Sequence, residues 1–370
     1  MLTKTKTPGA AVAIIKNGEV VYQNAYGYRD MVTESPMKLD HIFRIYSMSK
    51  PITSTAIMML WEKGKLQLND PISKYLPEFK NMTVAVENED QTEILETPKA
   101  KKSITIQDLL RHTSGLSYGL FGKQTAFRKT YSTAKISTNG VTSAEFVSNL
   151  AKLPLKGEPG EVWEYSFSTD VLGRIVEVIS GERLGDFMQK NILEPLGMKD
   201  TGFYMPKEKM NRVAQGYDYF TKKHPSYLLK AGEKPSMDSG GGGMLSTLSD
   251  YGKFSQMILN KGEFNGVRLL GRKTVEYMTA NHLSEKVDKG DLYLPGDGYG
   301  FGLGFAVRTH TGVSPEVGSV GEHAWSGWAG TGFWIDPKEN MISLFMVQDV
   351  VNAGYLRSTF KTLVYQTLVD

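Results

Sequence analysis

A serine and a lysine three residues apart form the most chemically suggestive pair in the chain. Ser47 and Lys50 lie in the segment 44–51, Arg-Ile-Tyr-Ser-Met-Ser-Lys-Pro, which contains the pattern Ser-x-x-Lys. On a helix, residues three apart share one face, so the hydroxyl and the amine can touch. A lysine in an apolar cleft or beside another cation loses basicity and can accept the proton of a serine nucleophile. The tetrapeptide alone is equally typical of an exposed helix start.

A helix is predicted to hold this pair. Apolar residues recur at helical spacing over residues 51–63, and Gly64 follows as a stop signal. Ser47 then lies at or just before the N-terminus of that helix. The helix dipole favours negative charge there, and the backbone N–H of Ser47 can face a developing oxyanion. This geometry suits nucleophilic attack on a carbonyl carbon.

Further motifs make the pair more specific. Tyr165-Ser166-Phe167 follows a Glu-Pro-Gly turn, and Trp325-Ser326-Gly327 precedes an aromatic strand pattern. The chain also carries Leu-Leu-Arg-His-Thr-Ser-Gly-Leu at 109–116 and four glycines at 240–243. Together with Ser-x-x-Lys, these motifs resemble the serine β-lactamase and penicillin-binding-protein superfamily. Within it, nearly the whole chain is similar to the class C-like esterase branch, the family VIII carboxylesterases.

The resemblance implies roles for individual residues. Ser47 would be the acylated nucleophile, Lys50 would share its proton, and Tyr165 would be the general base for acylation and the acid for the leaving group. The backbone N–H groups of Ser47 and Trp328 would form the oxyanion hole. The implied substrate-binding residues are Trp325, Ser326, Gly327 and Phe167.

Two departures from the family pattern narrow the substrate. Phe167 stands where lactamases carry an asparagine that helps to hold an amide, and Trp325 stands where they carry a cation. A cation would bind the carboxylate of a β-lactam or of a peptidoglycan peptide, whereas an indole suits an apolar group. We therefore expect a serine carboxylesterase that hydrolyses uncharged, short-chain esters through an acyl-Ser47 intermediate.

Other functions of the same fold stay open as alternatives. They are β-lactam hydrolysis, D-alanyl-D-alanine carboxypeptidase activity, and acyl transfer by the same Ser-Lys-Tyr machinery. A catalytically dead binding protein on this fold is disfavoured, because Ser47, Lys50 and Tyr165 are all retained.

A second motif competes for the nucleophile. Gly115-Leu116-Ser117-Tyr118-Gly119 satisfies Gly-x-Ser-x-Gly, the nucleophile elbow of α/β-hydrolases, which needs a strand before it and a helix after it. The preceding residues 106–111 have a helical pattern instead, so Ser117 is expected in a loop. His112 and His323 are expected in structural roles, and the spacing of the six histidines is not typical of a metal site.

The bulk composition excludes other classes of function. The chain has 370 residues, 40% of them hydrophobic and 22% charged, with a net charge of +3 and no cysteine. A net charge this small does not favour nucleic acid as a binding partner. The lack of cysteine excludes disulfides and a thiol nucleophile. No apolar run reaches the roughly 20 residues that span a bilayer, so no stable membrane insertion is expected. We expect a small-molecule ester as partner, no cofactor and no metal.

The N-terminus has a basic start and no apolar segment typical of a signal peptide after it. This predicts a cytoplasmic protein, or a periplasmic or secreted one whose signal peptide has been removed. The sequence does not indicate an oligomeric state.

Strand patterns stand at both ends of the chain, and helical patterns lie between them. Asn17-Gly18, between two apolar β-branched stretches, predicts a hairpin at the start. Later strands are predicted over residues 304–308, 332–335 and 342–348. Helices are predicted over residues 143–153, 170–179, 184–193, 248–259 and 355–368.

This order, with the resemblance, predicts the fold class. We expect an α/β (α+β), β-lactamase/transpeptidase-like fold, with an antiparallel sheet from both termini flanked by helices and an inserted, mainly helical lobe. The expected α/β domain is discontinuous, over residues 1–70 and 235–370. The expected helical domain covers residues 71–234, and the active site is expected at the interface of the two.

Overall fold

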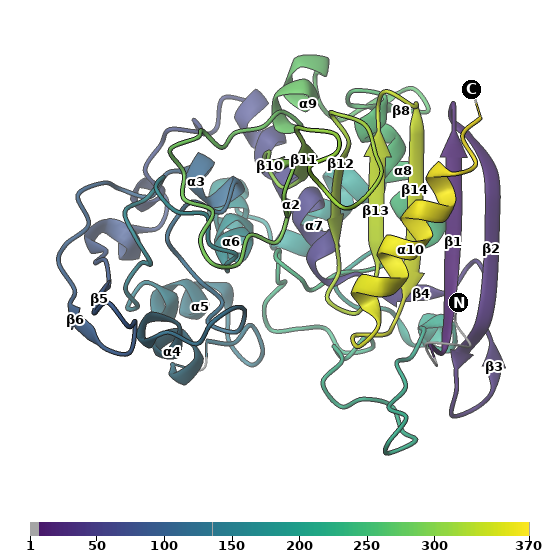
Figure 1. Ribbon diagram of the computed structural model, residues 1–370, viewed down its shortest axis with the longest axis horizontal. Coiled ribbons are helices and arrows are strands. Elements are labelled where there is room, and N and C mark those ends of the chain that lie inside the picture. The colour runs from purple at the N-terminus through teal and green to yellow at the C-terminus, as the bar shows by residue number, and fades with distance from the viewer. Residues whose placement is uncertain (1–6, 135, 370) are drawn as a thin grey trace.

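The computed structural model describes residues 7–134 and 136–369. Its centre is an eight-stranded antiparallel sheet in the order β10-β11-β12-β13-β14-β1-β2-β3 (Figure 1). The two ends of the chain meet in this sheet, because β1 pairs with β14 in a register that sets Ala10 opposite Val347. The strands are β1 (Gly9–Lys16), β2 (Glu19–Asp30), β3 (Ser35–Pro36), β10 (Tyr299–Phe301), β11 (Ala306–Arg308), β12 (His323–Ser326), β13 (Gly332–Asp336) and β14 (Met341–Val347).

The opening hairpin forms where the sequence predicted it. Asn17 and Gly18 both have positive φ angles, 55° and 82°, as the two central residues of a type I′ turn require. β1 and β2 then pair along their length, from Lys16 opposite Glu19 onward.

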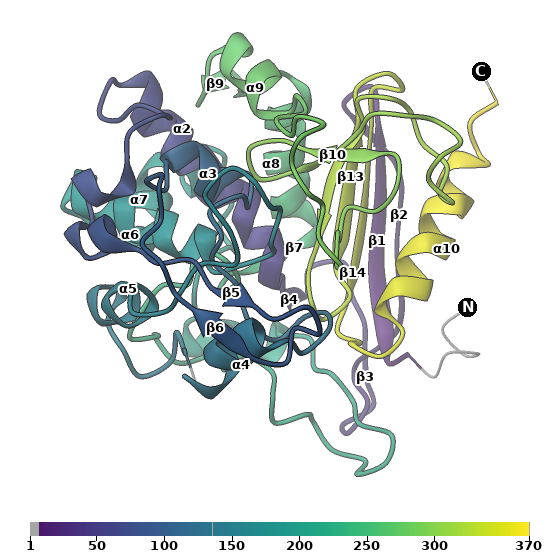
Figure 2. The ribbon, with the colours of Figure 1, turned by 60° about the vertical axis from the view of Figure 1, so that its left-hand side comes forward.

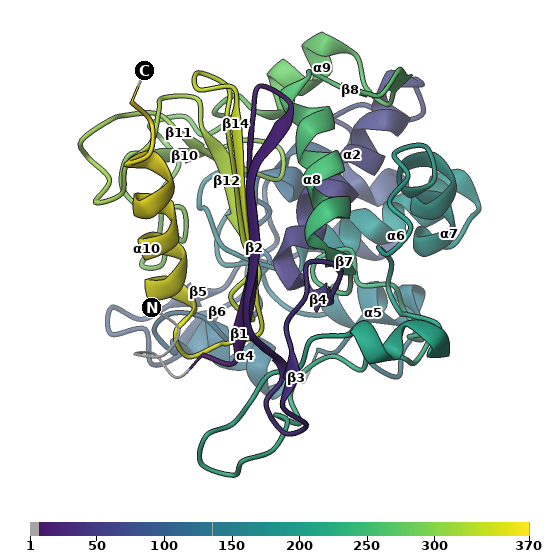
Figure 3. The same cartoon turned by 90° about the vertical axis from the view of Figure 1, so that its right-hand side faces the viewer.

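Two helices cover the two faces of the sheet (Figure 3). On one face, α10 (Ala353–Tyr365) buries Leu356, Phe360 and Val364 against β1, β13 and β14. On the other face, α8 (Leu248–Leu259) packs on β1 and β14. A Cβ atom on Gly252 of α8 would already lie 3.3 Å from Ile15, so this helix approaches the sheet closely.

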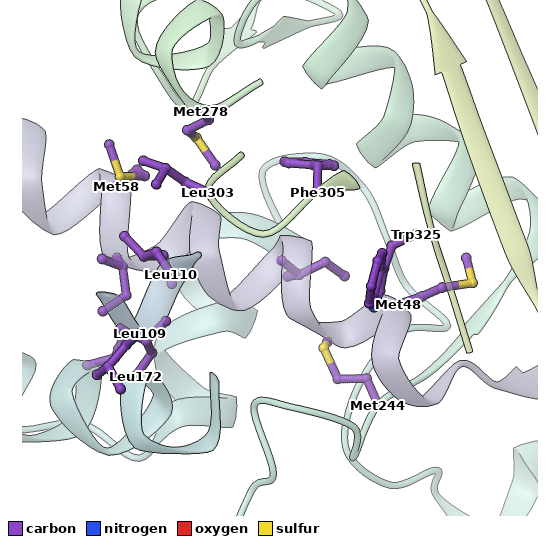
Figure 4. Packing of buried hydrophobic residues seen from close by; sticks show 14 of the residues in the cluster. Met48, Met58, Leu109, Leu110, Leu172, Met244, Met278, Leu303, Phe305 and Trp325 are labelled. Carbon is purple, nitrogen blue, oxygen red and sulfur yellow. The ribbon is translucent and has the colours of Figure 1, made fainter. Parts of the chain in front are cut away.

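The helical part of the chain packs beside the sheet around α2 (Ser49–Glu62), whose residues 49–60 are all buried (Figure 2). Leu109, Leu110 and Leu172 pack near α2 from the helical lobe (Figure 4). The other helices are α3 (Ile106–Leu110), α4 (Ala126–Thr133), α5 (Ser143–Leu150), α6 (Ser168–Ser180), α7 (Leu184–Met188) and α9 (Arg272–Met278). α7 continues as a π turn over Gln189–Leu193, where one regular helix was predicted.

Short elements complete the described chain. The two-stranded pairs are β4 (Ile42–Arg44) with β7 (Leu245–Thr247), β5 (Val86–Glu87) with β6 (Ile94–Glu96), and β8 (Glu263–Phe264) with β9 (Val267–Arg268). Short 3₁₀ turns cover Tyr46–Met48, Ile72–Lys74, Pro77–Asn81 and Lys207–Arg212. Within the described residues, no helix combines the length and apolar character needed to cross a bilayer. The predicted fold class is confirmed, and the division into two domains stays a prediction.

Candidate active site

Ser47 and Lys50 meet at the start of α2. Ser47 lies in the 3₁₀ turn Tyr46–Met48, directly before α2 begins at Ser49. Lys50 is 1% exposed, and its Nζ donates a hydrogen bond to Ser47 Oγ at 3.2 Å. The structure therefore brings together the two residues that the Ser-x-x-Lys spacing predicted to touch.

The Lys50 amine has two further acceptors. It donates to the carbonyl oxygen of Gly241 at 2.7 Å and to the hydroxyl of Tyr118 at 3.0 Å. Tyr118 comes from the loop after α3 and was not among the predicted catalytic residues. Burial raises the pKa of Tyr118 well above its ordinary value, and the nearby Asp170 carboxyl group raises it further. The Tyr118 phenol is therefore neutral at neutral pH, and its oxygen accepts a hydrogen bond from the Lys50 amine.

Tyr165 lies beside this pair but contacts Lys50 through its ring. The Lys50 Nζ atom is 4.6 Å from the centroid of the Tyr165 ring. The Tyr165 hydroxyl oxygen accepts a hydrogen bond from the indole Nε1 of Trp325 at 3.3 Å. Trp325 is 9% exposed and packs on Phe301, so it holds the Tyr165 phenol from the side of the sheet.

Two of the four glycines, Gly240 and Gly241, pack closely beside α2 and α6. A Cβ on Gly240 would lie 3.0 Å from Thr53 Cγ2, and one on Gly241 would lie 2.3 Å from Asp170 Oδ2. The N–H of Gly241 donates to Asp170 Oδ1 at 3.1 Å. Burial raises the pKa of Asp170, and the charge of Lys50 opposes that rise. The backbone of Gly241 thus lies between a buried carboxyl group, which accepts from its N–H, and the Lys50 amine, which donates to its carbonyl oxygen.

The turn between β12 and β13 lies against the Ser47 turn. A Cβ on Gly327 would lie 2.4 Å from the carbonyl oxygen of Ile45, so only glycine allows this approach. Within the described residues, the backbone N–H of Trp328 has no hydrogen-bond acceptor. Tyr46, which precedes the serine, has a φ of +43°, a strained conformation for a residue with a side chain. Ser326 lies half-buried at the end of β12.

Ser117, the competing nucleophile, is engaged elsewhere. It is 1% exposed, and its hydroxyl donates to Glu164 Oε1 at 2.6 Å. Arg128 contacts Glu164 at 2.9 Å and Asp291 at 2.8 Å, so the three charged groups form one network. The preceding segment is helix α3, as predicted, and not the strand that a nucleophile elbow needs. The network ties the segment before Tyr165 to the segment before Tyr118.

The remaining candidates are buried side chains. His112 is fully enclosed, its Nδ1 lies 3.2 Å from Ser166 Oγ, and burial holds its pKa well below the ordinary value. Burial lowers the pKa of His323 to about 4. Phe167 is 8% exposed and packs on the Tyr118 ring with centroids 4.4 Å apart. Among the described residues, no group of three or more His, Asp or Glu side chains could hold a metal ion.

Comparisons with known proteins agree with this fold. The chain matches the sequence model of the Beta-lactamase family over residues 1–364, and it belongs to that family. It is 35% identical over 349 residues to Protein Rv1367c of Mycobacterium tuberculosis, covering 92% of this chain and 85% of that protein. It is 27% identical over 356 residues to Esterase EstB of Burkholderia gladioli, covering 90% of this chain and 84% of the esterase.

A solved structure has the same architecture. EstCE1, described as a hydrolase with promiscuous acyltransferase activity, superimposes with a TM-score of 0.80 at 25% identity, covering 98% of this chain and 95% of that one. The protein is therefore a serine hydrolase of the β-lactamase family with esterase relatives.

Proposed function

We propose that the protein is a carboxylesterase that hydrolyses uncharged, short-chain esters through an acyl-Ser47 intermediate. The observation that carries this proposal is the Lys50 amine, which donates to both Ser47 Oγ and the Tyr118 hydroxyl. A serine in contact with a buried amine, itself in contact with a phenol, has a route for its proton. The likeness to Esterase EstB and to EstCE1 supports an ester as the substrate.

For the attack Lys50 is in the amine form: it keeps its hydrogen bonds to Gly241 and Tyr118, and its lone pair takes the proton of Ser47 Oγ as this oxygen attacks the ester carbonyl carbon. The carbonyl oxygen becomes an oxyanion that accepts hydrogen bonds from the backbone N–H groups of Ser47 and Trp328. The carbon–oxygen bond to the alcohol breaks, Tyr165 gives its proton to the alkoxide, and the proton that Lys50 took from Ser47 passes to the Tyr165 oxygen. Water then attacks the acyl group, gives its proton to the same amine, and releases the acid and free Ser47.

Two tyrosines serve different steps in this proposal. Tyr118 accepts a hydrogen bond from Lys50 and holds the amine beside Ser47 while the proton moves. Tyr165 is proposed to protonate the leaving alkoxide, because the Trp325 indole N–H occupies its oxygen and leaves its own proton to be donated. Tyr165 thus keeps the acid role that the resemblance implied, and the role of general base, which the resemblance also gave to Tyr165, passes to Lys50.

The proposed substrate class rests on an uncharged pocket wall. Trp325 stands where lactamases of the family carry a cation, and its indole is packed against Tyr165 with ring centroids 5.5 Å apart. Phe167 supplies a second apolar side chain. Ser326 and Gly327 are proposed to line the substrate beside them. An anionic β-lactam or peptide carboxylate has no partner in such a wall, whereas a neutral ester does.

Acyl transfer is a second candidate, favoured by the likeness to a hydrolase with promiscuous acyltransferase activity. An alcohol in place of water would take the acyl group from Ser47 by the same proton route. The two outcomes compete for one acyl-enzyme, so adding an alcohol should divert product from acid to ester without changing the rate of acylation.

The experiment is turnover of p-nitrophenyl acetate and butyrate by wild type, Ser47→Ala and Ser117→Ala. We expect Ser47→Ala to lose turnover by at least about a thousandfold, as the loss of a nucleophile does. Ser117→Ala should lose less than tenfold. A fluorophosphonate should add its mass to Ser47, and labelling at Ser117 instead would reject the assignment. A chromogenic cephalosporin turned over as fast as the esters would reject the proposed substrate class.

A further inference from the structure

Three aromatic side chains gather beside the two N–H groups proposed to hold the oxyanion. Tyr46 directly precedes Ser47, and Trp328 carries the second N–H group. Their rings meet edge to face, with centroids 5.4 Å apart and an interplanar angle of 76°. Tyr227, from a loop far along the chain, packs on Trp328 in the same way at 5.3 Å and 74°. We call Tyr46, Tyr227 and Trp328 the aromatic shelf.

Backbone contacts hold the shelf in place. The N–H of Leu229 donates to the Tyr46 hydroxyl at 3.2 Å, and the Arg44 Nε donates to the carbonyl oxygen of Leu229 at 2.5 Å. The loop that carries Tyr227 is therefore tied to the strand that leads into Tyr46. The positive φ of Tyr46 is a cost that such surroundings must offset, and strained residues of this kind cluster at ligand sites.

The shelf is open to solvent and carries no charge. Trp328 is 41% exposed and Tyr227 is 56% exposed. Burial raises the pKa of both Tyr46 and Tyr227, so their phenols are neutral at neutral pH. Exposed aromatic residues are ordinary on a protein surface when they stand alone. These three differ because Tyr46 and Tyr227 both pack on Trp328, and because Trp328 and Ser47, the neighbour of Tyr46, carry the two N–H groups proposed to hold the oxyanion.

The positions of Tyr46 and Trp328 in the chain determine how close a bound ester lies to their rings. An ester whose carbonyl oxygen accepts a hydrogen bond from the Trp328 N–H lies close to the Trp328 indole, because the N–H group and the indole belong to the same residue. The Tyr46 ring is attached next to the attacking Ser47. One half of a bulky ester can therefore extend against these rings. Aromatic faces and edges favour flat apolar rings over linear chains, because offset and edge-to-face contacts add to simple burial.

We propose that the aromatic shelf is a subsite for a flat, apolar ring system in the acyl or the alcohol half of the substrate. The natural substrate is then an uncharged ester that bears a ring in one half and is short in the other, and Trp328 and Tyr227 determine this specificity. The inference rests on the proposed function and narrows its substrate class.

The test compares matched pairs of esters. For the acyl half the pair is p-nitrophenyl phenylacetate and p-nitrophenyl hexanoate. For the alcohol half it is 2-naphthylmethyl acetate and octyl acetate. In Trp328→Leu and Tyr227→Leu, we expect the ring-to-linear ratio of kcat/KM to fall about tenfold for one pair, mainly through KM. The pair that responds identifies the half that lies on the shelf.

Tyr277→Leu is the matched control, since Tyr277 is a 40% exposed aromatic residue on α9. It should leave both ratios unchanged. Equal ratios in wild type and both shelf variants would overturn the inference, while Ser47-dependent turnover of p-nitrophenyl acetate would still uphold the esterase.

A binding measurement separates the inference from catalysis. In Ser47→Ala, 2-naphthylmethyl acetate should quench tryptophan fluorescence with a Kd about tenfold tighter than in Ser47→Ala/Trp328→Leu. The same affinity in both proteins rejects the subsite, whether or not the wild type hydrolyses the ester. Thermal melts of the variants check that both are folded.

Discussion

The Nζ atom of Lys50 lies 3.0 Å from the hydroxyl oxygen of Tyr118, a residue 68 positions further along the chain. The same Nζ atom donates to Ser47 Oγ at 3.2 Å. The amine therefore joins the serine to a phenol that the sequence motifs had not assigned, whereas the assigned Tyr165 presents its ring face to Lys50.

This relationship predicts different effects for the two tyrosines. Tyr118→Phe removes the direct partner of the Lys50 amine, so kcat should fall about a hundredfold or more and the pH profile of kcat should change shape. Tyr165→Phe should lower kcat for esters of poor leaving groups more than for p-nitrophenyl esters, because the latter need little protonation. Steady-state kinetics over a range of pH checks both. A changed pH profile in Tyr165→Phe alone would show that Tyr165, and not Tyr118, governs the protonation of the Lys50 amine.

The site was partly readable from the sequence. Ser47 and Lys50 are three residues apart, so helical geometry alone brings them together, and Gly327 and Gly241 could be placed near them by motif. The Lys50–Tyr118 contact could not be predicted, because it depends on the path of the loop after α3. That path passes through positive φ angles at His112 and Gly115, which local spacing does not encode.

The fold, too, could be predicted only in part from the sequence. The Asn17-Gly18 turn follows from local conformational preference and was predicted, and the same preference explains why α6 ends at Gly181, which has a φ of 73°. The π turn after α7 was not predicted, since Gln189–Leu193 has an ordinary helical pattern and its hydrogen bonding depends on tertiary packing. Short helices such as α4 and α9 have too few turns to give a clear period.

The buried pair of Arg128 and Glu164 should be essential for stability. Their side chains are 2% and 7% exposed, so Arg128→Met leaves a carboxylate without its partner, at a cost of about 3–5 kcal/mol in the free energy of unfolding. The loss should also lower kcat, because Glu164 adjoins Tyr165 and holds Ser117 beside Tyr118. Denaturant unfolding and ester turnover measure the two effects.

An exposed ion pair supplies the control for that prediction. Arg268 and Glu263 are 51% and 43% exposed, so Arg268→Met should change stability by less than about 1 kcal/mol. The double variant Arg128→Met/Glu164→Gln should recover part of the loss, since it removes the unpaired charge. If Arg128→Met unfolds no more easily than Arg268→Met, the network is not a stabilising one.

His323 should make the protein less stable in acid. Its burial lowers its pKa to about 4, below the ordinary value of 6.5, so below pH 6.5 the unfolded chain takes up a proton that the folded chain refuses. The stability that neutral His323 permits is complete above pH 6.5 and is lost as the pH falls towards 4. With 1.36 kcal/mol for each pH unit, the loss is about 3 kcal/mol by pH 4.

Unfolding in urea at pH 7, 5.5 and 4 measures this loss. His323→Phe keeps the ring packed against Phe305 and cannot titrate, so its free energy of unfolding should fall less steeply between pH 7 and pH 4. His112 and His41, whose pKa values are also lowered by burial, keep a residual slope in that variant. Parallel slopes in wild type and His323→Phe would show that His323 is protonated in the folded protein.

Gly327 tests whether the β12–β13 turn supplies an oxyanion donor. In Gly327→Ala the new Cβ would meet the Ile45 carbonyl oxygen at 2.4 Å and Thr331 Oγ1 at 2.2 Å, so the turn must move away from the Ser47 turn. The displaced Trp328 N–H can no longer hold the oxyanion, and kcat should fall about 10²–10³-fold with a smaller change in KM. Gly354→Ala on α10 is the control, because a Cβ there has no heavy atom within 4 Å. Equal kcat values in the two alanine variants would remove Trp328 from the oxyanion hole and leave Ser47 to provide it with a different partner.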